Sequence, residues 1–136
     1  MYLRSRGFAL ASIALALFLG WKVLARGAHE VVVLRTETLQ GQDHYATLWV
    51  VDAEKFVWIR AESPTRRWLP AVRKNPQVTL RRGGRDLRYR ATIWDTPEAR
   101  AYVDPMFRAK YGLADTARAI LTQRETIPIR LEPQAR

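Results

Sequence analysis

The sequence has no cysteine among its 136 residues. Disulfides, thiolate nucleophiles and cysteine-based zinc or iron–sulfur sites are therefore excluded. Only two histidines occur, His29 and His44, and no carboxylate cluster accompanies them, so no metal site is expected. Low-complexity tracts are absent too, and 48% of the residues are apolar. This composition favours one globular domain over a disordered chain.

Acidic residues are the minority charge, with 13 Asp and Glu against 23 Lys and Arg, for a net charge of +10. The excess is concentrated between Arg60 and Arg90, where only Glu62 and Asp86 oppose the basic residues. Such a balance indicates an anionic partner. Three kinds remain open: anionic membrane lipids, a phosphate pocket built chiefly from Arg60, Arg66 and Arg67, and nucleic acid. Because no recognition helix or RNA-binding motif is present, no nucleic-acid partner is expected.

The only long stretch without charge is Gly7 to Leu19, with basic residues on both sides. A helix needs about 20 mostly apolar residues to cross a bilayer, and Trp21 and Lys22 extend this run suitably at an interface. We expect residues 1–27 to be a single-pass transmembrane anchor in a bacterial-type inner membrane, with the side of the soluble domain left open. A cleaved signal segment is the alternative, since Val23 and Ala25 suit a cleavage site.

Residues 28–136 are predicted to form the soluble domain, and their pattern alternates mainly with the period of strands. The strand that begins at His44 is expected to form a hairpin with the next one, Gly83-Gly84 supplies a tight turn, and Pro128 indicates an edge strand. The expected helices begin after a Ser63 or Thr65 cap and after a Thr96 cap. The predicted strands are 30–36, 44–51, 55–61, 77–82, 85–94 and 126–131, and the predicted helices are 66–74, 97–111 and 114–124.

This order predicts an α+β fold: a barrel of about six mostly antiparallel strands with peripheral helices, preceded by one N-terminal hydrophobic helix. Four motifs then carry a resemblance. They are ATLWVVD at 46–52, FVWI at 56–59, Trp68 seven positions before Asn75-Pro76, and ETIPIRLEP at 125–133. With these motifs in this order, the domain resembles the deazaflavin-dependent nitroreductase family, within the FMN-binding split-barrel superfamily that includes pyridoxamine phosphate oxidase.

The resemblance implies a split barrel that binds FMN or a deazaflavin, often as a homodimer with the cofactor at the interface. In this family the loop before the Trp helix and the turn between the first two strands hold the cofactor phosphates. When the family's binding positions are carried over to this sequence, one group of residues is predicted to bind the cofactor phosphate and another to contact its ring. Arg60, Arg66 and Arg67 would bind phosphate with hydrogen bonds from Ser63 and Thr65, and Trp68 would shape the ring pocket with Tyr45, Thr47 and Trp49 as a further wall. Core packing is the alternative for the tryptophans.

Both phosphate-binding elements depart from the family pattern. The loop at 61–67 is short and lacks glycine, and the turn at 39–43 lacks basic residues. Two functions follow as hypotheses. The first is a membrane-tethered flavin- or deazaflavin-dependent oxidoreductase with an unknown acceptor, in which the cofactor performs the chemistry and no protein catalytic residue is evident. The second is a non-catalytic split-barrel binding module at an anionic membrane surface that has lost its cofactor.

Overall fold

The computed structural model describes residues 30–134, except for 39, 63–66 and 123–124. The predicted membrane segment therefore lies outside the described residues. The strands are β1 (Val32–Thr36), β2 (His44–Leu48), β3 (Val51–Ala53), β4 (Phe56–Ala61), β5 (Gln77–Arg82), β6 (Arg85–Ile93) and β7 (Ile127–Pro133), and the helices are α2 (Trp68–Lys74), α3 (Pro97–Tyr111) and α4 (Leu113–Thr122). Within the described part of the chain, no helix is long and apolar enough to cross a bilayer.

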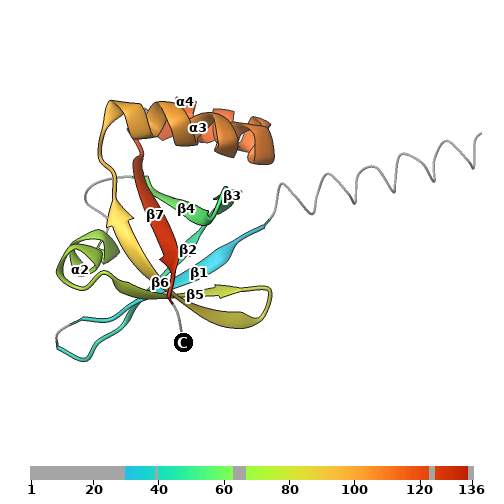
Figure 1. Ribbon diagram of the computed structural model, residues 1–136. Coiled ribbons are helices and arrows are strands. Elements are labelled where there is room, and N and C mark those ends of the chain that lie inside the picture. Colours follow the sequence, from blue (N-terminus) through green and yellow to red (C-terminus); the bar gives the residue numbers. More distant parts are fainter. Residues whose placement is uncertain (1–29, 39, 63–66, 123–124, 135–136) are drawn as a thin grey trace, which may run out of the picture.

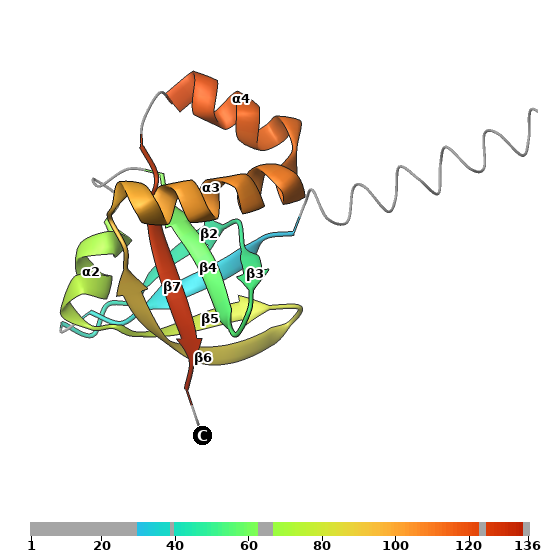
Figure 2. The same ribbon diagram turned by 45° about the horizontal axis from the view of Figure 1, so that its top comes forward.

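All seven strands form one antiparallel sheet with the order β2-β1-β5-β6-β7-β4-β3. The sheet curls strongly, so that β4 and β7 lie across β1 and β5 (Figures 1 and 2). The outermost strands, β2 and β3, are consecutive in the chain and are separated only by Trp49 and Val50. This curled sheet with helices on its outside confirms the predicted α+β split-barrel fold.

The strand predicted over 44–51 is two strands, so the sheet has seven strands rather than about six. β2 pairs with β1 through Thr36 opposite His44, whereas β3 pairs with β4, so the hairpin expected between 44–51 and 55–61 is wrong for β2. Side chains of α3 hold the backbone at the break between β2 and β3. Val50 N–H donates to the Tyr111 hydroxyl at 3.0 Å, and the Val50 carbonyl accepts from Lys110 Nζ at 2.7 Å. These long-range contacts replace the ladder that the local pattern predicted.

The prediction that Pro128 marks an edge strand is also wrong, because β7 lies between β6 and β4. The backbone N and O of one residue point to the same neighbour in an antiparallel ladder. The Pro128 carbonyl accepts from Trp94 N–H at 2.9 Å, just past Ile93, the last residue of β6. The missing N–H of Pro128 therefore faces a position beyond the end of β6, and no ladder bond is lost there.

Apolar side chains from alternate strand positions fill the inside of the barrel, and Trp68, Leu69 and Val72 of α2 close one end. The other face of β4 is covered by α3, which packs Val103, Phe107 and Tyr111 against Trp58. Trp58 and Trp68 are therefore core residues, as the packing alternative predicted, whereas Trp94 is 40% exposed. α4 packs on α3, outside the barrel (Figure 2).

Two predictions from local sequence signals are confirmed, the helix cap at Thr96 and the tight turn at Gly83-Gly84. Thr96 caps α3, its hydroxyl accepting from Ala99 N–H at 3.1 Å, and Gly83 and Gly84 have φ angles of 57° and 76° in the β5–β6 turn. The cap predicted for the preceding helix is wrong. α2 begins one residue after Arg67, which occupies the N-cap position without a side-chain hydrogen bond. Ser63 and Thr65 lie outside the described residues.

Candidate functional site

A cavity of about 270 Å³ lies between the β1–β2 connection and α2, and we call it the helix-end cavity. The chain segment after β1 supplies polar side chains on one side, and one face of α2 supplies the other. Its lining residues are Glu37, Thr38, Gln40, His44, Arg67, Pro70, Ala71 and Lys74. The family resemblance implies the turn between the first two strands and the loop before the Trp helix for cofactor phosphates, and of that loop only Arg67, its last residue, lines this cavity.

The helix-end cavity has two exposed cations, Arg67 and Lys74, and neither forms an ion pair with a described residue. They are seven positions apart, close to two helical turns, which places both on the same face of α2. Pro70 and Ala71 lie between them and give this wall an apolar middle. Two unpaired cations across a small apolar surface suit a phosphate group.

A second cavity of about 140 Å³, the seam cavity, is lined by residues of β2 and β4, two strands that do not pair with each other. Trp49 is its main aromatic wall, and the ring of Trp49 stacks on Tyr111 with centroids 4.4 Å apart and planes 9° apart. Thr47 is exposed and adds a hydroxyl. The lining residues are Val31, Thr47, Leu48, Trp49, Arg60, Glu62 and Phe107.

Arg60 lines the seam cavity, but its guanidinium already forms ion pairs with two carboxylates of the same chain. Nη1 lies 2.9 Å from Asp104 Oδ1, Nη2 lies 2.6 Å from Asp115 Oδ1, and the guanidinium carbon lies 3.9 Å from the centre of the Phe107 ring. Burial alone would raise the pKa of Asp115, but hydrogen bonds and charge from Arg60 and Arg118 hold that pKa below its usual range. The phosphate-binding role of Arg60 stays a prediction, and its contacts in the structure are with α3 and α4.

The structure separates the other predicted site residues. Thr47 and Trp49 meet at the seam cavity, Arg67 lies at the helix-end cavity, and Trp68 is buried in the core with its Nε1 meeting no acceptor in the structure. Tyr45 is 67% exposed and lines a different hollow on the outer face of the sheet, beside Arg35. Ser63, Thr65 and Arg66 lie outside the described residues.

Of the residues that line the helix-end cavity, only Arg67 was predicted as a site residue, and Lys74 and Thr38 are among those missed. Lys74 could have been found from its spacing to Arg67, since residues at i and i+7 share a helix face. Thr38 could not, because its place depends on how the β1–β2 connection folds toward α2. Its side chain is fixed locally, with Gln42 N–H donating to the Thr38 hydroxyl at 2.9 Å.

The two cavities are lined by residues that are close in the sequence. Glu62 lines the seam cavity, and Arg67, five positions later, lines the helix-end cavity. Along β2, His44 of one cavity and Thr47 of the other are three residues apart, about 10 Å at the rise of a strand. A ligand with an aromatic ring at one end and a phosphate at the other could contact both cavities.

The donor chemistry of these residues fits a flavin-type group: an indole wall and a hydroxyl at one cavity, and two cations at the other. The seam cavity is nonetheless small, because pockets that enclose a drug-sized ligand usually measure about 300–1,000 Å³. The described residues of one chain thus offer one wall for a ring system rather than an enclosure. A second protein surface would be needed to cover the other face of the ring.

The sequence matches no protein-family model and no curated protein. Solved structures do match. An F420-H2-dependent reductase superposes with a TM-score of 0.57 at 19% identity, over 76% of this chain and 95% of its own. A candidate pyridoxamine 5'-phosphate oxidase from Listeria innocua gives 0.56 at 15% identity, over 86% and 94%. A protein described as a domain-swapped dimer gives 0.62 at 18% identity, over 89% and 99%. At these identities the similarity establishes the fold, and it confirms the split-barrel resemblance seen in the motifs.

Proposed function

We propose that this chain is a membrane-tethered reductase that uses a flavin or a deazaflavin. The observation that carries the proposal is the pair of cations Arg67 and Lys74, which face the β1–β2 connection and form no ion pair with a described residue. The motif resemblance implies cofactor phosphates at this junction, and an F420-H2-dependent reductase shares the fold. Because a fold by itself does not determine a function, the residues of the site have to support the proposal.

In this proposal Arg67 and Lys74 bind the phosphate, and Trp49 and Thr47 provide a wall for the ring. The bound cofactor would supply the hydride transfer. The described residues bind and orient it, and Trp49 is itself positioned by stacking on Tyr111. The acceptor is not specified by these residues.

A homodimer belongs to the same proposal. The seam cavity gives only one wall for a ring, so a second copy would supply the covering surface. A domain-swapped dimer with this fold is consistent with such an assembly. Membrane attachment through residues 1–27 remains our proposal from the uncharged run at Gly7–Leu19.

The test is direct cofactor binding by the full-length, detergent-solubilised chain. The absorbance spectrum of the purified protein would be recorded first, followed by titrations with FMN and with F420. We expect one of them to bind well below millimolar concentration, where the binding free energy is only about 4 kcal/mol. If neither binds below that level, the reductase proposal is wrong and the non-catalytic binding module becomes the better description.

A further inference from the structure

Helix α4 has its charged side turned toward the protein. Asp115 is only 1% exposed and accepts from Arg60 Nη2 at 2.6 Å and from Arg118 Nε at 3.0 Å. Arg60 comes from β4, so α4 is attached to the body of the domain by an interior ion pair. Asp115 is the only residue of α4 that is fully buried.

The apolar side of α4 faces away from the protein. Leu113, Ile120 and Leu121 are 88%, 66% and 83% exposed, and Ala117 between them is exposed as well. Their spacing of i, i+4, i+7 and i+8 forms one continuous stripe along the helix. A surface helix of a soluble domain normally turns such a stripe inward. We call Leu113, Ala117, Ile120 and Leu121 the outer stripe.

The outer stripe begins beside the point where the N-terminal segment joins the domain. Glu30, the first described residue, forms an ion pair with Lys110 near the end of α3, and its carbonyl accepts from the Tyr111 hydroxyl at 2.7 Å. Leu113 starts α4 just two residues after Tyr111. Figures 1 and 2 agree that the start of β1 and the α3–α4 corner lie at the same end of the molecule.

Chain length puts this end of the molecule close to any membrane that holds the N-terminal segment. Three residues lie between Arg26, near the end of the predicted anchor, and Glu30, and these four steps of extended chain span at most about 3.6 Å each, or roughly 14 Å. The ten residues of α4 extend about 15 Å. A helix of that length, starting at that corner, lies within reach of the bilayer interface.

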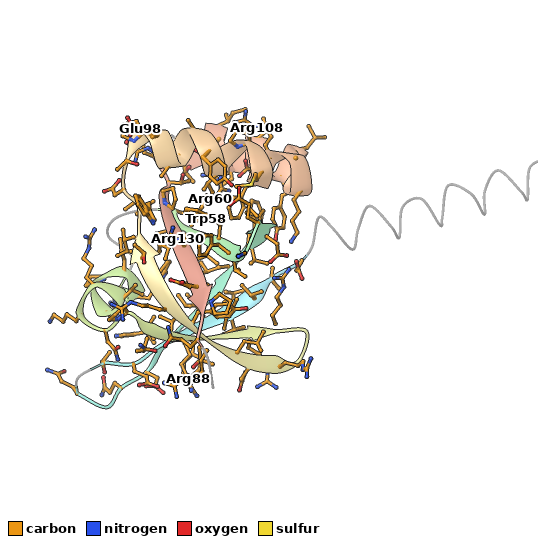
Figure 3. All side chains as sticks on the ribbon, in the orientation of Figure 1. Trp58, Arg60, Arg88, Glu98, Arg108 and Arg130 are labelled. Carbon is orange, nitrogen blue, oxygen red and sulfur yellow. The ribbon has the colours of Figure 1, made fainter. Side chains whose placement is uncertain are left out.

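The charges at this end match anionic lipid. Arg108 in the last turn of α3 is exposed and forms no ion pair with a described residue, and Figure 3 shows it toward the α3–α4 corner. An exposed apolar helix stripe next to a basic side chain is the arrangement of interfacial helices.

We propose that α4 lies in the membrane interface, with the outer stripe among the lipid chains and Arg108 near anionic headgroups. The inference rests on the proposed membrane attachment but is independent of the cofactor. It specifies which surface of the domain faces the bilayer, and it leaves the helix-end cavity open to water because α2 lies at the opposite side from the α3–α4 corner (Figure 1).

Because the chain has no cysteine, a single introduced cysteine can carry an environment-sensitive fluorophore. The full-length Leu121→Cys protein would be reconstituted into phosphatidylcholine vesicles containing phosphatidylglycerol and a lipid with a quencher on its acyl chain. Asp43→Cys is the matched control, since Asp43 is exposed on the β1–β2 connection and its side chain forms no hydrogen bond or ion pair with a described residue. We expect several-fold stronger quenching of the label at 121 than of the label at 43.

Co-sedimentation with the vesicles separates the two proposals. If the chain sediments but the label at 121 is no more quenched than the label at 43, α4 does not lie in the interface and only this inference is wrong. Crosslinking of two Leu121→Cys chains without lipid quenching would show a second copy on the stripe and would equally overturn it. If the chain does not sediment, membrane attachment and this inference are both wrong.

Discussion

Nη2 of Arg60 lies 2.6 Å from Oδ1 of Asp115, an ion pair between β4 and α4 in which both side chains are at most 5% exposed. The same guanidinium reaches Asp104 on α3 at 2.9 Å. One arginine therefore joins β4 to two helices, α3 and α4, that follow it at a distance in the sequence. Because the charges are buried, their removal one at a time has large and measurable consequences.

The Asp115→Asn variant is expected to lose stability. Removing one partner of a buried ion pair leaves the other charge uncompensated, which typically costs about 3–5 kcal/mol, and Asp104 would reduce the loss toward the lower end. Thermal unfolding of the full-length protein in detergent measures it. Asp86→Asn is the matched control, because Asp86 forms an exposed pair with Arg81 at 3.8 Å and should change stability by no more than about 1 kcal/mol. Equal losses in the two variants would contradict the prediction.

Acid pH should lower the free energy of unfolding through Asp115 and through Asp52, two carboxylates with lowered pKa values. The hydrogen bond from Arg82 lowers the pKa of Asp52, and Arg60 and Arg118 lower that of Asp115 despite its burial. A lowered folded-state pKa contributes stability above the unfolded pKa of about 4, and this contribution is lost as the pH falls through the folded-state value. The free energy of unfolding should be nearly constant between pH 7 and 5 and fall below about pH 4. Urea titrations at each pH would show a shallower fall for Asp115→Asn than for the unmodified chain. Parallel curves would show that Asp115 is not a source of the acid sensitivity.

Tyr111→Phe should destabilise the junction between β2 and β3. The Tyr111 hydroxyl accepts from the buried Val50 N–H at 3.0 Å, and an unsatisfied buried donor costs about 1–3 kcal/mol. Tyr102→Phe provides the comparison. Tyr102 makes an edge contact with Trp58 that phenylalanine would keep, and its hydroxyl forms no hydrogen bond with a described residue. Unfolding midpoints in urea that are the same for both variants would disagree with this assignment.

Cofactor affinity should depend on the cations of the helix-end cavity. Lys74→Ala and Arg67→Ala should each raise the dissociation constant of the bound flavin or deazaflavin by about 10- to 100-fold, since a hydrogen bond to a charged group contributes about 1.5–3 kcal/mol. Arg73→Ala is the control, because Arg73 is an exposed cation on the same helix that does not line the cavity. Fluorescence or absorbance titration measures the constants. An equal effect of Arg73→Ala would indicate diffuse charge attraction rather than a phosphate site.

Local signals in the sequence predicted the elements that local forces determine. Thr96 and Pro97 start α3, Gly83-Gly84 turns the chain between β5 and β6, and alternating apolar residues define the barrel interior. The pairing partners of β2 and the interior place of β7 were mispredicted. Both depend on contacts from far along the chain, such as the Tyr111 hydroxyl on Val50 and Trp94 N–H on the Pro128 carbonyl.

The candidate site shows the same difference between residues whose role the sequence predicted and residues whose role depends on long-range contacts. Arg67, Thr47 and Trp49 line cavities, as a binding role requires. Arg60 is drawn into an interior network by Asp104 and Asp115, and those partners lie 44 and 55 residues away in the sequence. A charge in a basic run carries no signal of whether it will meet phosphate or a carboxylate of its own chain. That distinction needs the packing of α3 and α4.

The two-residue connection between β2 and β3, made by Trp49 and Val50, also affects how the domain could associate with other copies of itself. Strands at the border of a sheet present unpaired N–H and C=O groups that can recruit another chain into an extended aggregate. Here the two border strands, β2 and β3, are tethered by only two residues, so their unpaired groups stay near one another instead of at opposite extremes of a flat sheet. An incoming strand would have to approach beside Trp49, whose ring stacks on Tyr111 of α3. The short tether therefore protects the domain from edge-on polymerisation.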